Sequence, residues 1–554
     1  MSTKQSLIAL LLFSLFVFVF SFNALVYYRN DFYQPLLWKG IFYGILNPQD
    51  FHWELVKSAQ ASAVFAITVV ASSLLKKKGS YGDARFARMS DVKKFTFNML
   101  ADAGLLIAKF KGKYLRNDDN QSILIAAPQG AGKSAGSLIP MMLSYQQSML
   151  SLDVKGELWN TTSKQRSQFS TCRIFSPIMG MPEHEAMVSW NPLDKSIIDE
   201  VLAASKATNG GKEDFNRVIE YVIKITKVIF PTAKADGNAK YFISRAGEIF
   251  THVAIYNIRL NGGTSIPAVF DEVMATSDIK AKISEIMDMA ESIGDTYSVT
   301  KGNSLLSSSD DSFSDFTSTF GQTLDLFVSP IARKSLESCD FTARTFRESP
   351  FSLYLHLPTG NKEQVLPIFS LLITYLTGEL LTDSHDKEKD QQITFFLDEF
   401  YQLGKMQEMV DMPTLGRSYG LRVVYAFQNF GQMVKVYGKD IVSEMMSSAD
   451  IKIIYQQNET ETAKRFSDTI GKTTRKRRSR SHSTSLTKDQ GSQSTNEEGV
   501  PLMLPQDFLN LKQGEVVVIA KGHAERPIKA KSLYWEKEAS MKHLGGYAYD
   551  FEIK

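Results

Sequence analysis

The chain has 554 residues, of which 43% are hydrophobic and 22% charged, and this composition excludes an intrinsically disordered protein. The length exceeds what one hydrophobic core usually supports, so we expect several domains. The formal net charge is only +3, so the chain as a whole gives no argument for binding nucleic acid. Cys172 and Cys339 are far apart, which fits a reducing compartment and excludes a cysteine metal site.

Two uncharged stretches near the N-terminus predict membrane-spanning helices. Leu7–Leu25 is long enough to cross a bilayer as a helix. A cleaved signal peptide is the alternative, but the apolar run is longer than a usual signal core and no small-residue cleavage site follows it. Ser58–Leu75 is shorter and carries small residues that suit helix packing in a membrane, with a buried soluble helix as its alternative. Lys76, Lys77 and Lys78 follow it and favour the cytoplasmic side, where we expect the remaining chain.

Beyond residue 120, short apolar runs alternate with helical patterns. Such runs are typical of strands that are buried on both faces of a parallel sheet. We therefore expect an α/β fold, in which helices cover a parallel sheet. The predicted strands are Ile123–Ala126, Met149–Asp153, Arg173–Phe175, Ser352–Leu357, Thr394–Leu397, Arg422–Ala426 and Ile451–Tyr455.

Two segments depart from this rhythm. Residues 195–339 are mostly helical in period, which predicts an all-α domain inserted into the α/β domain; we expect a polar loop at Val299–Asp315 within it. Thr473–Gly499 has almost no apolar residue and is expected to be a mobile loop or a long hairpin. Its basic cluster, Arg475–Arg480, could contact phosphates or anionic lipid head groups, but it has no interleaved aromatic residues for stacking on bases. A solvated basic loop without a partner is the alternative.

The sequence "APQGAGKS", Ala127–Ser134, lies between a predicted strand and a predicted helix, as a phosphate-binding loop does. The usual pattern is G-x-x-x-x-G-K-[ST], and here Ala127 stands at the first glycine position. Backbone N–H groups of such a loop surround a phosphate at the positive end of the following helix. We expect Lys133 to reach the β- and γ-phosphates and Ser134 to bind Mg²⁺. The predicted nucleotide-binding residues are Gln129, Gly130, Ala131, Gly132, Lys133, Ser134 and Ala135.

A partner motif is expected at the end of another strand, and "ITFFLDEF" supplies it. In P-loop ATPases the strand-terminal acid, here Asp398, helps to hold Mg²⁺, and the next one, here Glu399, activates the attacking water. Gln428 ends a later strand and could sense the γ-phosphate. Arg417 precedes that strand and could act as an arginine finger in a neighbouring subunit, with an ordinary surface arginine as the alternative. We therefore predict Lys133, Glu399, Gln428 and Arg417 as catalytic residues.

At these residues the chain resembles a known family, the coupling ATPases of type IV secretion and conjugation (TraG/TraD-type). The P-loop is followed by "LSLDVKGELWNTTSKQR", similar to the D-x-K-G-E-L block of the family, and by "SWNPLD". The blocks "FFLDEFYQLGKM", "GRSYGLRVVYAFQNFGQM" and "ETAKRFSDTIGKTT" follow in the family's order. An alanine at the first P-loop position also occurs in this family.

The resemblance implies a RecA-like P-loop ATPase domain, formed by residues 79–194 and 340–554, with an all-α domain at 195–339. A membrane anchor at 1–78, with two transmembrane helices and a short periplasmic loop, would place the protein in the bacterial inner membrane. It implies ATP and Mg²⁺ as cofactors and assembly into a homo-hexamer. The ring would contact the bilayer and the channel components of the secretion system. It would deliver a relaxase–DNA complex, effector proteins or both.

Two other functions stay open at this stage. The chain could be a membrane receptor or scaffold that uses nucleotide for assembly only. It could also be a translocase of double-stranded DNA like FtsK, which shares the motor but matches the intervening blocks less well.

Overall fold

The computed structural model describes residues 20, 56–60, 62–64, 81–95, 97, 104–178, 184–208, 210–232, 235–357, 360, 362–382, 386, 389–481 and 492–553. The chain divides into two compact units, Met1–Asp83 and Ala84–Lys554. The predicted membrane helices, Leu7–Leu25 and Ser58–Leu75, lie almost entirely outside the described residues. No helix in the described part of the chain is long and apolar enough to span a bilayer.

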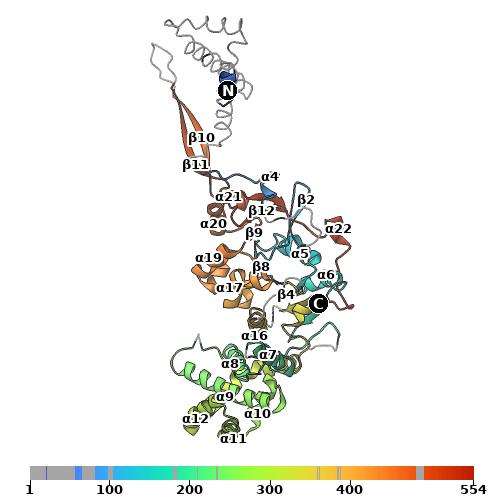
Figure 1. Cartoon of the computed structure of the whole chain (residues 1–554), viewed down its shortest axis with the longest axis vertical. Coiled ribbons are helices and arrows are strands. Elements are labelled where there is room, and N and C mark those ends of the chain that lie inside the picture. Colours follow the sequence, from blue (N-terminus) through green and yellow to red (C-terminus); the bar gives the residue numbers. More distant parts are fainter. Residues whose placement is uncertain are drawn as a thin grey trace. The chain divides into compact units, whose positions relative to one another are not determined.

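The unit Ala84–Lys554 is built on an eleven-stranded sheet (Figure 1), in the order β2-β1-β13-β12-β9-β3-β8-β7-β4-β6-β5. Neighbours from β9 to β5 are parallel, and all seven predicted strands lie in this part of the sheet. These strands are β9 (Ile451–Ile454), β3 (Ile123–Ala126), β8 (Leu421–Phe427), β7 (Ile393–Leu397), β4 (Ser148–Asp153), β6 (Phe351–His356) and β5 (Thr171–Phe175).

The sheet is mixed, so the parallel sheet expected from the sequence forms only part of it. Beyond β9, each pair of neighbours is antiparallel. The additional strands are β12 (Glu515–Ala520), β13 (Ile528–Lys531), β1 (Leu105–Phe110) and β2 (Lys113–Asn117). They form two hairpins that join the edge of the parallel sheet. Since a hairpin strand needs only its neighbour and a turn, short half-polar strands such as β2 and β13 leave a weak signal in the sequence.

The parallel strands are buried on both faces. In β3, Leu124 and Ala126 belong to one hydrophobic core, whereas Ile123 and Ile125 belong to the other. Helices contribute to both cores and so cover both faces, as the sequence predicts for a parallel sheet. The helices that cover the two faces include α5 (Ile139–Ser144), α6 (Glu157–Arg166), α16 (Lys362–Leu380) and α18 (Phe430–Tyr437).

Between β5 and β6 the described chain is predominantly helical, and most of these helices gather at one end of this unit (Figure 1). They are α7 (Lys195–Thr208), α8 (Asn216–Ile229), α9 (Gly237–Asn261), α10 (Ile266–Ala275), α11 (Ile279–Ser292), α12 (Thr296–Leu306), α13 (Asp310–Val328) and α14 (Pro330–Leu336).

The prediction of a polar loop at Val299–Asp315 is wrong, because α12 and α13 occupy most of this segment. Its serines and aspartates mark helix beginnings instead. The side chain of Ser309 accepts a hydrogen bond from the backbone N–H of Ser312, and Asp310 lies in the first turn of α13. Small polar and acidic residues are favoured at a helix N-terminus because they satisfy free N–H groups and the helix dipole.

The basic stretch near residue 480 is a hairpin, one of the two structures expected for it. β10 (Lys472–Ser481) pairs with β11 (Ser492–Pro501) in antiparallel register, and the tip lies outside the described residues. The amine of Lys476 lies 3.6 Å from a carboxylate oxygen of Glu497 across the two strands. At the base, the N–H of Ala84 donates to the carbonyl of Lys472 (3.1 Å).

Candidate nucleotide-binding site

The loop that follows β3 has the backbone of a phosphate-binding loop. Gly130 and Gly132 have φ angles of 78° and 87°, which glycine adopts at little cost. The N–H of Ala127 donates to the carbonyl of Phe427 (3.0 Å), so this residue extends the pairing of β3 with β8, and its methyl group is buried. The first position of the pattern therefore has no need of a glycine in this chain.

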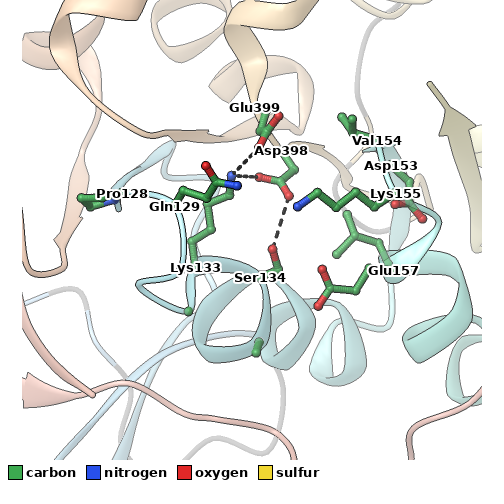
Figure 2. A pocket seen from close by; sticks show the side chains of 14 residues that line it. Pro128, Gln129, Lys133, Ser134, Asp153, Val154, Lys155, Glu157, Asp398 and Glu399 are labelled. Carbon is green, nitrogen blue, oxygen red and sulfur yellow. Dashed lines mark hydrogen bonds and ion pairs between the residues drawn. The ribbon is translucent and has the colours of Figure 1, made fainter. Parts of the chain in front are cut away.

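The loop ends in a π-helical turn, η1 (Ser134–Leu138), and presents Lys133 and Ser134 to the acids that follow β7 (Figure 2). The amine of Lys133 lies 2.9 Å from Asp398 Oδ1 and 3.3 Å from Glu399 Oε1. The hydroxyl of Ser134 donates to Asp398 Oδ2 (3.3 Å). Because β3, β8 and β7 are parallel neighbours, their carboxyl ends lie at one edge of the sheet, and the two motifs meet there.

Burial and charge act in opposite directions on Lys133. Burial disfavours its charged form, but the carboxylates of Asp398 and Glu399 outweigh this effect and raise the pKa of the amine. The pKa of Asp398 is raised, first because the carboxyl is buried, although the ammonium of Lys133 opposes the rise. The cation and the two acids therefore form one coupled cluster, in which the loss of either partner would leave a buried charge uncompensated.

Glu399 is held in an unusual conformation. Its backbone is left-handed, with φ 50° and ψ 45°, which costs roughly 1–2 kcal/mol for a residue other than glycine. Its Oε1 accepts hydrogen bonds from Lys133 and from Gln428 Nε2 (3.1 Å), and the side-chain amide of Gln402 donates to the other oxygen. Three donors thus fix the carboxylate, and Gln428 lies at the site as the sequence predicts.

A third element borders the same cavity, the turn between β4 and α6. Asp153, Lys155 and Glu157 line it together with the P-loop (Figure 2). Asp153 accepts the N–H of Trp159 (2.8 Å), and burial raises the pKa of its carboxyl to about 7. Burial, and then the charge of Asp398, raise the pKa of Glu157.

Sequence reasoning did not assign these three residues to the site. The signal was available, because they follow a predicted parallel strand whose carboxyl end must lie at the same edge as the P-loop.

The remaining predicted P-loop residues line the cavity, except Ala131. The N–H of Ala131 donates to the carbonyl of Pro128 (3.1 Å) and so closes the loop itself.

Arg417 lies away from this cavity. It belongs to a short 3₁₀ turn, η4 (Gly416–Tyr419), before β8, whereas the P-loop follows β3. These strands are parallel, so Arg417 lies at the opposite edge of the sheet, about 20 Å from the site along β8. Its side chain is exposed and takes part in none of the ion pairs of the described residues. Arg417 therefore does not complete the site of its own chain.

Leu533 and Tyr534, which follow β13, hydrogen-bond to the backbone of the P-loop and of the turn after it. The hydroxyl of Tyr534 donates to the carbonyl of Ala131 (3.2 Å), and the N–H of Leu533 donates to the carbonyl of Gly136 (3.0 Å). A Cβ atom on Gly132 would lie 2.5 Å from the Tyr534 hydroxyl oxygen. Glycine is therefore needed at position 132 for two reasons, the positive φ angle and the close approach of Tyr534.

The donor set fits a magnesium–nucleotide complex. A glycine-rich loop at a helix N-terminus and the amine of Lys133 suit phosphate groups. Mg²⁺ prefers oxygen ligands, and the Ser134 hydroxyl and the Asp398 carboxylate provide them side by side. Fold and site together define a P-loop nucleotide-binding protein of the α/β class.

Comparison with known proteins gives the family. The protein-family model described as "Type IV secretory system Conjugative DNA transfer" matches residues 70–551, so the chain belongs to this family. It is 26% identical over 435 residues to Protein VirD4 of Agrobacterium fabrum, covering 78% of this chain and 61% of the relative. It is 25% identical over 389 residues to the conjugal transfer protein TraG of Escherichia coli, covering 65% and 56%. The chain thus spans about three fifths of the length of these relatives.

Solved structures show the same fold. The plasmid coupling protein TrwB in complex with the ATP analogue ADPNP superposes with a TM-score of 0.56 at 17% identity, covering 83% of this chain and 95% of that one. The complex of TrwB with ADP and Mg²⁺ has a TM-score of 0.55 at 16% identity, covering 82% and 97%. At this identity the likeness concerns the fold, which confirms the predicted α/β P-loop architecture.

Proposed function

We propose that this chain is the coupling ATPase of a type IV secretion system and uses ATP hydrolysis to pass substrates to the secretion channel. The observation that carries the proposal is the cluster of Lys133, Ser134, Asp398, Glu399 and Gln428 at one edge of the sheet. Membership of the conjugative DNA transfer family supports the cellular role. The plasmid coupling protein TrwB, which has the same fold, is known in complex with ADPNP and with ADP and Mg²⁺, and this supports ATP and Mg²⁺ as cofactors here.

Each residue has a role in this proposal. Lys133 exchanges its carboxylate partners for phosphate oxygens when nucleotide binds. Ser134 and Asp398 would hold Mg²⁺, which would supply neutralisation of phosphate charge when bound. Glu399, which Gln402 and Gln428 still hold once Lys133 has moved to the phosphates, orients the attacking water and accepts its proton. Gln428 reports the state of the phosphate, since it contacts Glu399 directly.

We further propose that the active form is a homo-hexamer. Arg417 is exposed and lies at the opposite edge of the sheet from the site of its own chain. A ring would bring this edge of one subunit to the nucleotide of the next, where an arginine neutralises the charge of the transition state.

The remaining assignments belong to the same proposal. Residues 1–78 anchor the chain in the bacterial inner membrane through two transmembrane helices, 79–194 with 340–554 form the RecA-like domain, and 195–339 form the all-α domain. Partners are the bilayer, the channel components of the secretion system, and a relaxase–DNA complex, effector proteins or both. The uncharged stretches near the N-terminus and the helices between β5 and β6 support this division.

The first test is ATP hydrolysis by the purified full chain. Lys133→Ala and Glu399→Gln should each lower the turnover by about 100-fold or more, because they remove the phosphate ligand and the general base. Lys435→Ala, an exposed lysine of α18, is the control and should leave turnover unchanged. Wild-type rates in both site variants would refute the ATPase proposal.

A second test separates the cellular roles. Crosslinking in living donor cells, followed by identification of what co-purifies, should recover relaxase, DNA or effector. Substrate transfer that survives Glu399→Gln would favour a receptor that uses nucleotide for assembly only. Translocation of duplex DNA by the purified chain would favour a pump like FtsK.

A further inference from the structure

The turn between β4 and α6 places a second lysine at the nucleotide site. Lys155 lines the same cavity as Lys133 and Ser134. Figure 2 shows its amine directed into the cavity toward Asp398, with the carboxylate of Glu157 facing the same space. Two lysines therefore line the cavity, one from the loop that follows β3 and one from the turn that follows β4.

The two lysines differ in their partners. Lys133 is paired with Asp398 and Glu399. None of the ion pairs found in the described chain includes Lys155. Its positive charge favours the ionised form of Glu157 and so acts to lower the pKa of that carboxyl, against the effect of burial. A cation that enters an anion-binding cavity without a partner is available for a ligand oxygen.

The chain fixes the backbone that carries Lys155. The buried carboxyl of Asp153 accepts the N–H of Trp159 (2.8 Å), so it ties the end of β4 to the first turn of α6 across the segment that carries Lys155. Gly156 then takes a left-handed conformation, with φ 70°, to begin α6. The turn thus has one defined shape rather than that of a free surface loop.

Phe551 and Ile553, which are distant in the sequence, contact this turn and the start of α6. A Cβ atom on Gly156 would lie 2.6 Å from Cγ2 of Ile553, so the isoleucine packs directly on the turn. Asn160 donates to the carbonyl of Ile553 (2.7 Å) and accepts its N–H (2.9 Å). The indole of Trp159 donates to the carbonyl of Phe551 (2.7 Å).

We infer that Lys155 is a second phosphate-binding residue, which contacts the γ-phosphate of the bound nucleotide from the side opposite Lys133. Ile553 is the positioning residue for it, acting through the turn at Gly156. This inference rests on the proposed nucleotide site and adds a residue that tells a triphosphate from a diphosphate. The carboxyl end of β4 is the place for such a residue, because β4 lies next to β7, which carries the acids of the site.

The test compares the affinities of the purified full chain for Mg–ADPNP and Mg–ADP. Lys155→Met should weaken ADPNP by about 10- to 100-fold, as expected for one charge-assisted hydrogen bond, and ADP by less than about threefold. Lys155→Arg should retain most of the discrimination, because it keeps the charge. Lys164→Met, at the exposed far end of α6, is the matched control and should change neither affinity.

Ile553→Ala should reduce the ratio of the two affinities in the same direction by about threefold or more, because the turn loses its outer support. In the Lys155→Met background it should have no further effect on this ratio. A role of Ile553 in stability alone would lower the unfolding midpoint and leave the ratio unchanged, which would overturn its assignment as a positioning residue.

Equal losses for ADP and ADPNP in Lys155→Met, or no loss for either, would overturn the inference for Lys155. Failure of the proposed function gives a different result, because then the wild-type chain itself would not bind Mg–ADPNP. Lys133→Ala serves as the reference for a site that has lost its phosphate ligand.

Discussion

Replacing Gly132 by alanine tests how the P-loop is supported. Gly130 is a matched control, since both glycines have positive φ, at 87° and 78°. An added Cβ atom has no neighbour within 4 Å at Gly130, whereas at Gly132 it would lie 2.5 Å from the hydroxyl oxygen of Tyr534 and 2.6 Å from its ring. The two variants therefore share the backbone strain and differ in the steric conflict.

The expected magnitudes follow from these contacts. Alanine in the left-handed region costs about 1–2 kcal/mol, which applies to both variants. At Gly132 the ring of Tyr534 must also move, at a cost of about 1–3 kcal/mol for overpacking. It would lose its hydrogen bond to the carbonyl of Ala131, worth about 1 kcal/mol. Gly132→Ala should therefore destabilise the nucleotide-free protein by about 2–4 kcal/mol more than Gly130→Ala.

The assay is unfolding of the nucleotide-free chain, followed by titration with Mg–ADPNP. Tyr534→Ala removes the conflicting ring, so Gly132→Ala combined with Tyr534→Ala should be less destabilised than the sum of the single changes. Equal destabilisation in Gly130→Ala and Gly132→Ala, or strict additivity with Tyr534→Ala, would show that Tyr534 does not support the loop.

Three further changes test other parts of the site. Ala127→Gly should leave ATP turnover within about threefold of wild type, because Ala127 only extends β3; a large gain would mean that the loop is impaired. Arg417→Ala should lower turnover by about 10³-fold with little loss of ADPNP affinity, and mixing it with Lys133→Ala subunits should restore part of the activity; no recovery would contradict a finger acting between subunits. Burial raises the pKa of Asp153 to about 7, so its contribution to stability is complete at low pH and is lost as the pH rises from 4 toward 7. Asp153→Asn should therefore be more stable than wild type at pH 8, by at most about 4 kcal/mol, with the difference vanishing near pH 4; parallel stability curves would contradict this.

The seven parallel strands could be predicted because each is buried on both faces and reads as a short apolar run. β3 and β8 are of this kind, and the acids after β7 were identified from the same pattern. Of the antiparallel strands, β12 (EVVVIA) also reads as a short apolar run, but β1, β2 and β13 were not identified from the sequence. β13, for example, has exposed residues at alternate positions, and its pairing depends on the turn that connects it to β12.

The site was predicted where one short motif carries the chemistry, as in Lys133 and Ser134. It was incomplete where distant segments meet. Tyr534 and Ile553 contact the loop and the turn through packing, and packing between distant segments leaves no local pattern. Lys155 was missed for another reason, because its block was read as a family signature rather than as residues at the end of a strand.

The backbone of Glu399 leads directly into η3 (Phe400–Leu403), and η3 packs against α16. On α16, Tyr375 lies 5.5 Å from the ring of Trp190 and 6.2 Å from that of Tyr221 on α8. The hydrophobic core runs without interruption from the sheet through α16 into the helices between β5 and β6. A close-packed core of this kind transmits displacement instead of absorbing it.

We therefore expect the helices between β5 and β6 to move as a rigid body with α16 when Glu399 changes its conformation. A change at the nucleotide site during hydrolysis would then displace the far ends of these helices. Amide hydrogen exchange on α16 and α8 should then stay slow in both the ADPNP and the ADP states, and rapid exchange in either state would indicate a hinge.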